Sequence, residues 1–183
     1  MSSSRLPDLD EPCGKHHTYR DLVECGETWE AFTPDNSPRE LRSYNALQEL
    51  AERVLDPIWD EFGKLTVTYG FAGPGLYRRI RKQIAPTLDQ HVAYERNAKG
   101  RLICERGGAA CDLIVGGVNS ADVAQWVAGH TDFDRIYYYG TDRPVHISVS
   151  ANPVRKCTVV ERSKTGRARP ITYSQRGFLK QVL

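Results

Sequence analysis

The chain has 183 residues, of which 40% are hydrophobic and 26% charged. These values are typical of one globular domain that is large enough to bury a substantial core. No apolar run approaches the roughly 20 residues that cross a bilayer, and the first residues lack the apolar segment of a signal peptide. The five cysteines form no Cys-x-x-Cys pair, which argues against a disulfide framework or a cysteine zinc site and favours a reducing, cytoplasmic location.

The net charge of +2 conceals an uneven distribution along the chain. Residues 155–183 contain eight Lys or Arg residues and one acid, whereas the rest of the chain holds more acids than bases. A basic C-terminal extension on an acidic body predicts contact with a polyanion or an acidic partner. A solvated extension that binds nothing is the alternative. Residues 1–15 are polar and contain prolines, so we expect a flexible N-terminus.

The first half of the chain predicts mainly helix. A short helix is expected after Thr18. Residues 37–40 read Ser-Pro-Arg-Glu, which matches a capping box with proline at the first helical position. Apolar residues then recur at helical spacing over residues 41–58. Pro57 should kink or end this helix, and Gly63 should finish it.

A strand and a basic segment follow. Residues 65–69 are rich in β-branched side chains and predict a strand. The glycine-rich residues 70–75 break it, but they contain neither of the glycine patterns that bind phosphate. Residues 76–84 predict a basic, solvent-facing helix. Residues 87–101 predict a long loop or short hairpin that carries His91.

The second half predicts strands around one further helix. Small residues lead into an apolar run at residues 112–115, which is typical of a buried strand. Ser120 can cap a helix that runs to about residue 129. An aromatic-rich strand at 133–139 then turns back into a strand at 145–150, and the two form an antiparallel hairpin. The order of these elements predicts an α+β fold with a small antiparallel sheet and flanking helices.

Two further short strands are predicted within the basic segment, at residues 157–160 and 171–173.

Three residues in this half are of types that bind divalent metals: Glu105, Asp112 and His146. In the predicted strand at 145–150, His146 shares one face with Ser148. Three such residues in a chain of this length are weak evidence by themselves, because a carboxylate at the start of a strand is more often a cap or an ion-pair partner. A metal site is therefore one hypothesis among others.

Several short motifs stand in a fixed order along the chain. They are His-Thr-Tyr-Arg-Asp-Leu at 17–22, Asp-Asn-Ser-Pro at 35–38, Val-Leu-Asp-Pro at 54–57, Thr-Tyr-Gly-Phe-Ala-Gly-Pro at 68–74, Glu-Arg-Gly-Gly-Ala-Ala-Cys-Asp at 105–112, and the segment from Tyr139 to Ser148. Together they resemble the zinc D-Ala-D-Ala carboxypeptidase family, most of all its smaller phage and bacterial members, which share a fold with the hedgehog signalling domain. The resemblance implies three parts: a flexible N-terminus at 1–15, a carboxypeptidase-like domain at 16–153 and a basic extension at 154–183.

The resemblance also implies a ligand set. The family's His, Asp and His zinc ligands fall by position on Glu105, Asp112 and His146, so a glutamate replaces the first histidine. The family's catalytic base, three residues before the last histidine, falls on Arg143, with Asp142 beside it. These two residues are the catalytic candidates.

One further departure concerns the arginine that orients substrate in the family, because its position falls on Ala72. Arg143 or Arg79 would have to replace it.

These departures favour a binding or accessory module with a degenerate active site, a pseudoenzyme with or without a retained divalent metal. The alternative is a metal-dependent hydrolase of amide or peptide bonds with an altered Glu/Asp/His set, which would hold Zn²⁺, or Mn²⁺ or Fe²⁺. In this alternative His91 is a candidate extra ligand, and Cys104 or Cys111 could tune the site. The partner would be a peptide, a small molecule or a protein, with polyanion or nucleic-acid contact through the basic extension as an accessory property.

Overall fold

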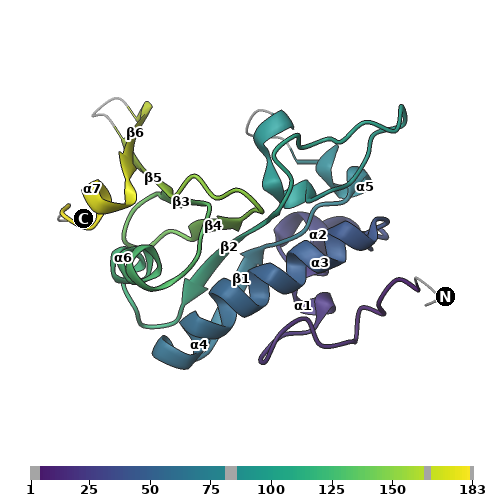
Figure 1. The fold of residues 1–183 in the computed structure, drawn as a ribbon, viewed down its shortest axis with the longest axis horizontal. Helices are drawn as coiled ribbons and strands as arrows, with labels where there is room; N and C mark the ends of the chain where they lie inside the picture. The colour runs from purple at the N-terminus through teal and green to yellow at the C-terminus, as the bar shows by residue number, and fades with distance from the viewer. Residues whose placement is uncertain (1–4, 81–85, 163–165, 182–183) are drawn as a thin grey trace.

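A six-stranded mixed sheet organises the protein, as seen in a computed structural model that describes residues 5–80, 86–162 and 166–181. The strand order is β1-β2-β4-β3-β5-β6, and every neighbouring pair is antiparallel except β3 and β5 (Figure 1). The strands are β1 (Leu65–Tyr69), β2 (Ala109–Val115), β3 (Arg135–Tyr138), β4 (Val145–Val149), β5 (Lys156–Arg162) and β6 (Ala168–Ser174). The α+β class predicted from the sequence is confirmed. The antiparallel part comprises β1, β2, β4 and β3, and a parallel pairing then extends the sheet.

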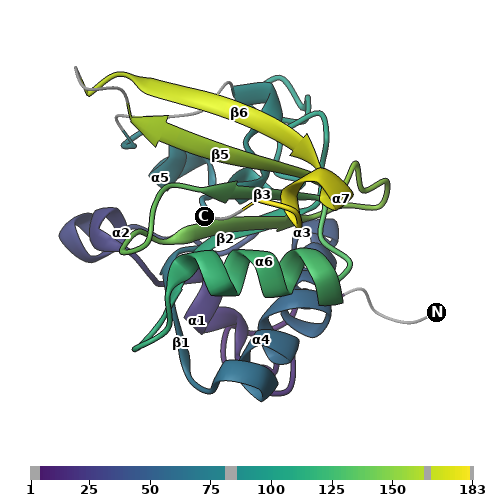
Figure 2. The ribbon, with the colours of Figure 1, turned by 90° about the vertical axis from the view of Figure 1, so that its left-hand side faces the viewer.

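Most of the helical residues lie on one face of this sheet, where α3, α4 and α6 cover it (Figure 2). Apolar side chains of these helices pack against residues such as Leu113 on β2 and Ile147 on β4, both fully buried. The helices are α1 (Tyr19–Val23), α2 (Glu27–Phe32), α3 (Leu41–Leu50), the π-helix η1 (Ala51–Leu55), α4 (Asp56–Phe62), α5 (Pro74–Tyr77), the short 3₁₀ turns η2 (Pro86–Leu88) and η3 (Gln90–Val92), α6 (Ser120–His130) and α7 (Gln175–Phe178). Within the described residues, no helix combines the length and the apolar character needed to cross a membrane.

The long helix predicted around Pro57 is present as three successive segments, α3, η1 and α4. Because proline has no N–H to donate, the backbone widens into one π-helical turn before Pro57, which starts α4. The predicted capping box at residues 37–40 does not form, and α3 begins at Leu41. The acceptor at this helix start is instead the buried carboxylate of Glu95, which lies far away in the sequence.

The segment predicted as a basic helix is shorter than expected in its described part. Helix α5 covers only Pro74–Tyr77, and residues 81–85 lie outside the described residues. The predicted hairpin in the next loop is present, because Arg96 and Leu102 form an antiparallel bridge around a turn.

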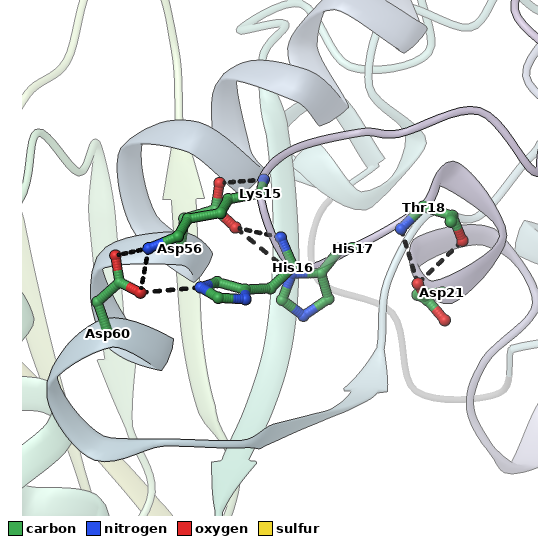
Figure 3. Close-up of polar contacts among 7 residues, drawn as sticks. All are labelled: Lys15, His16, His17, Thr18, Asp21, Asp56 and Asp60. Atoms are coloured by element: carbon green, nitrogen blue, oxygen red, sulfur yellow. Dashed lines mark hydrogen bonds and ion pairs between the residues drawn. The ribbon is translucent and has the colours of Figure 1, made fainter.

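The N-terminal segment, expected to be flexible, is held against α4 over its described part. The carboxylate of Asp56 accepts hydrogen bonds from the backbone N–H groups of Lys15 and His16, at 2.7 and 3.2 Å (Figure 3). The carboxylate of Asp60 contacts the Lys15 ammonium and the His16 ring, both at 2.8 Å. Cys13 is buried in the core beside them.

The basic C-terminal segment continues the sheet rather than standing apart from it. The two short strands predicted there are confirmed as parts of β5 and β6. β5 pairs with β3, and the side chains of Cys157 and Phe178 are fully buried in the common core. Residues 163–165 and 182–183 of this segment lie outside the described residues. Polyanion contact through this segment stays a prediction.

Candidate metal centre

The register of the sheet brings Asp112 and His146 together. Asp112 on β2 is directly paired with His146 on β4, and Tyr69 and Tyr137 continue the same row on the two flanking strands. Because paired residues of neighbouring strands project to the same face, these side chains form one line on the face opposite the helical core. His146 Nδ1 lies 2.9 Å from Asp112 Oδ1.

A third ligand-type side chain, His91, reaches this line from η3. Its Nδ1 lies 2.8 Å from the carbonyl oxygen of Gly70, and its own carbonyl accepts the N–H of Ala72. A carbonyl only accepts hydrogen bonds, so Nδ1 carries a proton, and in the neutral ring the lone pair of Nε2 faces the Asp112–His146 pair. Such a hydrogen bond on the far nitrogen is typical of histidines that bind metals, since it fixes the tautomer and the ring orientation.

The three candidate ligand atoms form a compact triangle. His91 Nε2 lies 3.2 Å from His146 Nδ1 and 3.6 Å from Asp112 Oδ1, and the third side is the 2.9 Å contact between His146 and Asp112. With bonds near 2.0–2.1 Å, two ligands of a tetrahedral zinc ion lie about 3.3 Å apart. The triangle therefore matches one face of a zinc tetrahedron, and these three residues form a group that could hold a metal ion.

The charges at this site are strongly coupled. Burial alone would raise the pKa of Asp112, but hydrogen bonds and charge from His146 and His91 hold it well below its usual range. Burial alone would lower the pKa of His91, but Asp112 raises it above its usual value. The carboxylate is therefore ionised across the physiological pH range, as a metal ligand must be.

Two glycines immediately precede β2, next to this site. Gly107 and Gly108 both have positive φ angles, of 63° and 90°. A Cβ on Gly108 would lie only 2.0 Å from the carbonyl oxygen of Val149. The side-chain amide of Gln90, next to His91, donates to the carbonyls of both Gly107 and Val149 and so ties η3 to this turn. The small residues before Asp112 thus permit a close backbone approach that places His91 over the sheet.

Of the three ligands expected from the sequence, the structure brings together Asp112 and His146 but not Glu105. The Glu105 side chain is exposed and lines a different hollow, while its backbone N–H donates to the carbonyl of Thr87. The motif of the resembling family places its first ligand seven residues before the aspartate, which is Glu105 in this sequence. His91 stands 21 positions before Asp112, and the Arg96–Leu102 hairpin lies between them.

The two catalytic candidates do not reach the centre. Asp142 and Arg143 are exposed on the turn between β3 and β4, and neither lines the cleft. The backbone of this turn is held over the start of α6, where Ser120 Oγ donates to the Arg143 carbonyl. Because β4 begins at Val145, the residues three and four positions before His146 lie on the turn and face solvent.

The other residues considered from the sequence lie elsewhere. Arg79 stacks on the ring of Phe32, with 4.7 Å between its guanidinium carbon and the ring centroid. Cys104 and Cys111 are buried in two separate apolar clusters and are not part of the group that could hold a metal.

The centre opens into a cleft of about 700 Å³, a volume typical of small-molecule or peptide sites. Glu27 and Glu30 of α2 stand on one wall, and Tyr139 and the buried carboxylate of Asp89 stand near the ligands. No Lys or Arg side chain is among the described residues that line this cleft. The described side chains that line the cleft therefore carry a net negative charge.

Comparisons of this chain with family models, with curated proteins and with solved structures found no match. Its function has to be inferred from the geometry and chemistry of the cleft.

Proposed function

We propose that the protein is a divalent-metal-dependent hydrolase whose centre consists of His91, Asp112 and His146. The single observation that carries this proposal is the triangle of ligand atoms at the floor of an open cleft. Catalytic zinc sites use three protein ligands and leave the fourth position to water or substrate. A fully protein-enclosed structural site would instead supply four ligands.

Zn²⁺ is the metal that this donor set favours. Two imidazoles and one carboxylate offer borderline and hard donors at distances that suit a tetrahedral ion. Mn²⁺ and Fe²⁺ accept the same donors but prefer more ligands, which water would have to provide. A bound zinc ion supplies a nucleophilic water near neutral pH and polarises a carbonyl oxygen.

The chain's own residues have distinct roles in this proposal. Asp89 is the one buried carboxylate on the described cleft wall outside the ligand set, and its Oδ1 accepts the backbone N–H of His91 at 3.1 Å. It is our candidate general base. Burial and the Asp112 charge raise the pKa of Tyr139, so its hydroxyl stays protonated and can donate to a substrate oxygen. These roles take the place of those expected for Asp142 and Arg143.

The bond class we propose is an amide or peptide bond. The resemblance of the sequence motifs to D-Ala-D-Ala carboxypeptidases supports this class. With His91 as the first ligand, the proposed set is two histidines and one aspartate, as in that family, so the loss of the first histidine no longer argues for a degenerate site. Water would add across the C–N bond to give a carboxylate and an amine.

A binding module on the same scaffold is the second candidate function. The observation that favours it is the absence of Lys or Arg among the described lining residues, since charge-stabilising donors are usually the largest single contribution to acyl-transfer catalysis. Such a module would hold metal and ligand without turnover.

The test combines metal analysis with an activity assay. The purified protein should contain close to one zinc per chain, and D-alanine should be released from a peptide ending in D-Ala-D-Ala. The release should stop on chelation and in the Asp89→Asn variant, which leaves the three ligands in place. Metal without turnover of any peptide would select the binding module. Absence of metal after growth and purification with added zinc would rule out both.

A further inference from the structure

A second hollow, of about 650 Å³, lies apart from the metal centre and is lined by arginines. It shares no described lining residue with the acidic cleft. Four guanidinium groups stand around it, with one carboxylate, that of Glu105. The four are Arg39, Arg78, Arg96 and Arg101.

These arginines converge from three separate segments of the chain. Arg39 precedes α3, where its backbone N–H binds the buried Glu95 carboxylate at 3.0 Å. Arg96 follows Glu95 directly and pairs with Leu102 across the hairpin turn, and Arg101 precedes Leu102, while Arg78 is the C-cap residue of α5. The buried Glu95 thus anchors both the helix start and the hairpin. The backbones that carry the arginines therefore belong to three separate parts of the fold.

Most of this positive charge is not neutralised by carboxylates of the residues that the structure describes. Arg96 lies 3.5 Å from the carboxylate of Glu40 and also donates to the Gly100 carbonyl. The side chains of Arg39, Arg78 and Arg101 have no carboxylate partner among the described residues. Like charges gathered around a concave surface repel one another, and the repulsion is relieved when an anion binds between them.

We propose that this hollow binds a phosphate-bearing small molecule with two or more phosphoryl groups, such as a nucleoside diphosphate. One carboxylate is satisfied by a single bidentate arginine, whereas a diphosphate offers enough oxygens and charge for several. The apolar side of the hollow, with Pro74, Leu102 and Ile103, provides a surface for the organic part of the ligand. The proposal is independent of the metal centre.

The test is calorimetric titration of the full chain with ADP, with inorganic pyrophosphate and with adenosine, in buffer without phosphate. ADP and pyrophosphate should bind, ADP more tightly, and adenosine should not. Arg101→Ala and Arg78→Ala should each weaken ADP binding about tenfold, the effect of losing a charge-assisted hydrogen bond. Glu105→Gln should tighten it about threefold by removing a repelling charge at the surface. A gain in affinity cannot result from misfolding.

The matched control is Arg169→Ala, which removes an exposed arginine of β6 far from the hollow in the sequence. It should leave ADP affinity unchanged. Equal weakening by this control, or loss of binding in His146→Ala or after chelation, would place the anion elsewhere and overturn the proposal. Absence of binding by pyrophosphate and ADP at millimolar concentration would overturn it as well. Tight binding of adenosine alone would overturn the phosphate assignment.

Discussion

His91 Nε2 lies 3.2 Å from His146 Nδ1, although the two residues are 55 positions apart in the sequence. Without a metal, a proton on His146 Nδ1 can be shared between Asp112 Oδ1 and His91 Nε2. With that proton removed, the same three atoms could hold a metal ion.

The first prediction concerns the identity of the first ligand. His91→Ala and His146→Ala should each lower zinc affinity by more than about 100-fold, because loss of one of three ligands exceeds the effect of disturbing an outer-shell partner. Elemental analysis after dialysis measures the bound metal. Glu105→Gln is the control and should keep full occupancy. If it lost zinc as His91→Ala does, the ligand set assigned here would be wrong.

The second prediction concerns stabilisation by metal. Zinc at 100 times its Kd should add about 2.7 kcal/mol to the free energy of unfolding, since it binds the folded chain alone. For a chain of this size, that corresponds to a rise in Tm of about 5–10 °C. Differential scanning fluorimetry with and without chelator gives the shift. The same rise in Asp112→Asn would show that the stabilising zinc binds at another place.

The third prediction concerns Glu95. Its carboxylate is only 1% exposed and accepts from the N–H groups of Arg39 and Glu40 and from Ser43 Oγ. Glu95→Ala leaves these donors buried without an acceptor, so we expect a loss of about 2–3 kcal/mol in the free energy of unfolding. Urea unfolding provides the measurement. Glu49→Ala, which removes an exposed i,i+4 pair with Arg53, should cost less than about 0.5 kcal/mol.

The fourth prediction concerns pH. Burial lowers the pKa of His17, against the opposing charges of Asp21 and Asp56, whose nearest oxygen lies 3.8 Å from its Nδ1 (Figure 3). The unfolded chain therefore takes up a proton near pH 6.5 that the folded chain does not. The resulting stability is complete above pH 6.5 and declines as pH falls toward the lowered pKa, by up to about 1.4 kcal/mol per pH unit.

His17→Gln should flatten the dependence of the unfolding free energy on pH between 7 and 5. His130→Gln, at the exposed end of α6, serves as the control and should leave the slope unchanged. An identical slope in wild type and His17→Gln would show that His17 does not contribute.

Local patterns predicted most elements well because they depend on neighbours in the chain. Alternating residues identified β4, and β-branched residues identified β1, with bounds within a residue or two. The start of α3 was misplaced because its acceptor, Glu95, comes from outside the local sequence. The C-terminal segment was misjudged as an extension because the pairing of β5 with β3 is long-range and parallel.

The sequence by itself determined the α+β class, the strand that carries His146 and the presence of Asp112 in a buried strand. Only the tertiary structure decided that His91, and not Glu105, lies with Asp112 and His146 in the group that could hold a metal ion. The physical reason is that a motif read at fixed spacing assumes an uninterrupted chain. Here the Arg96–Leu102 hairpin lies between His91 and Asp112. The His91 ring donates to the Gly70 carbonyl, the Ala72 N–H donates to the His91 carbonyl, and the Gln90 amide donates to the Gly107 and Val149 carbonyls, so that η3 is held against the sheet. Those contacts exist only once β1, β2 and β4 have paired.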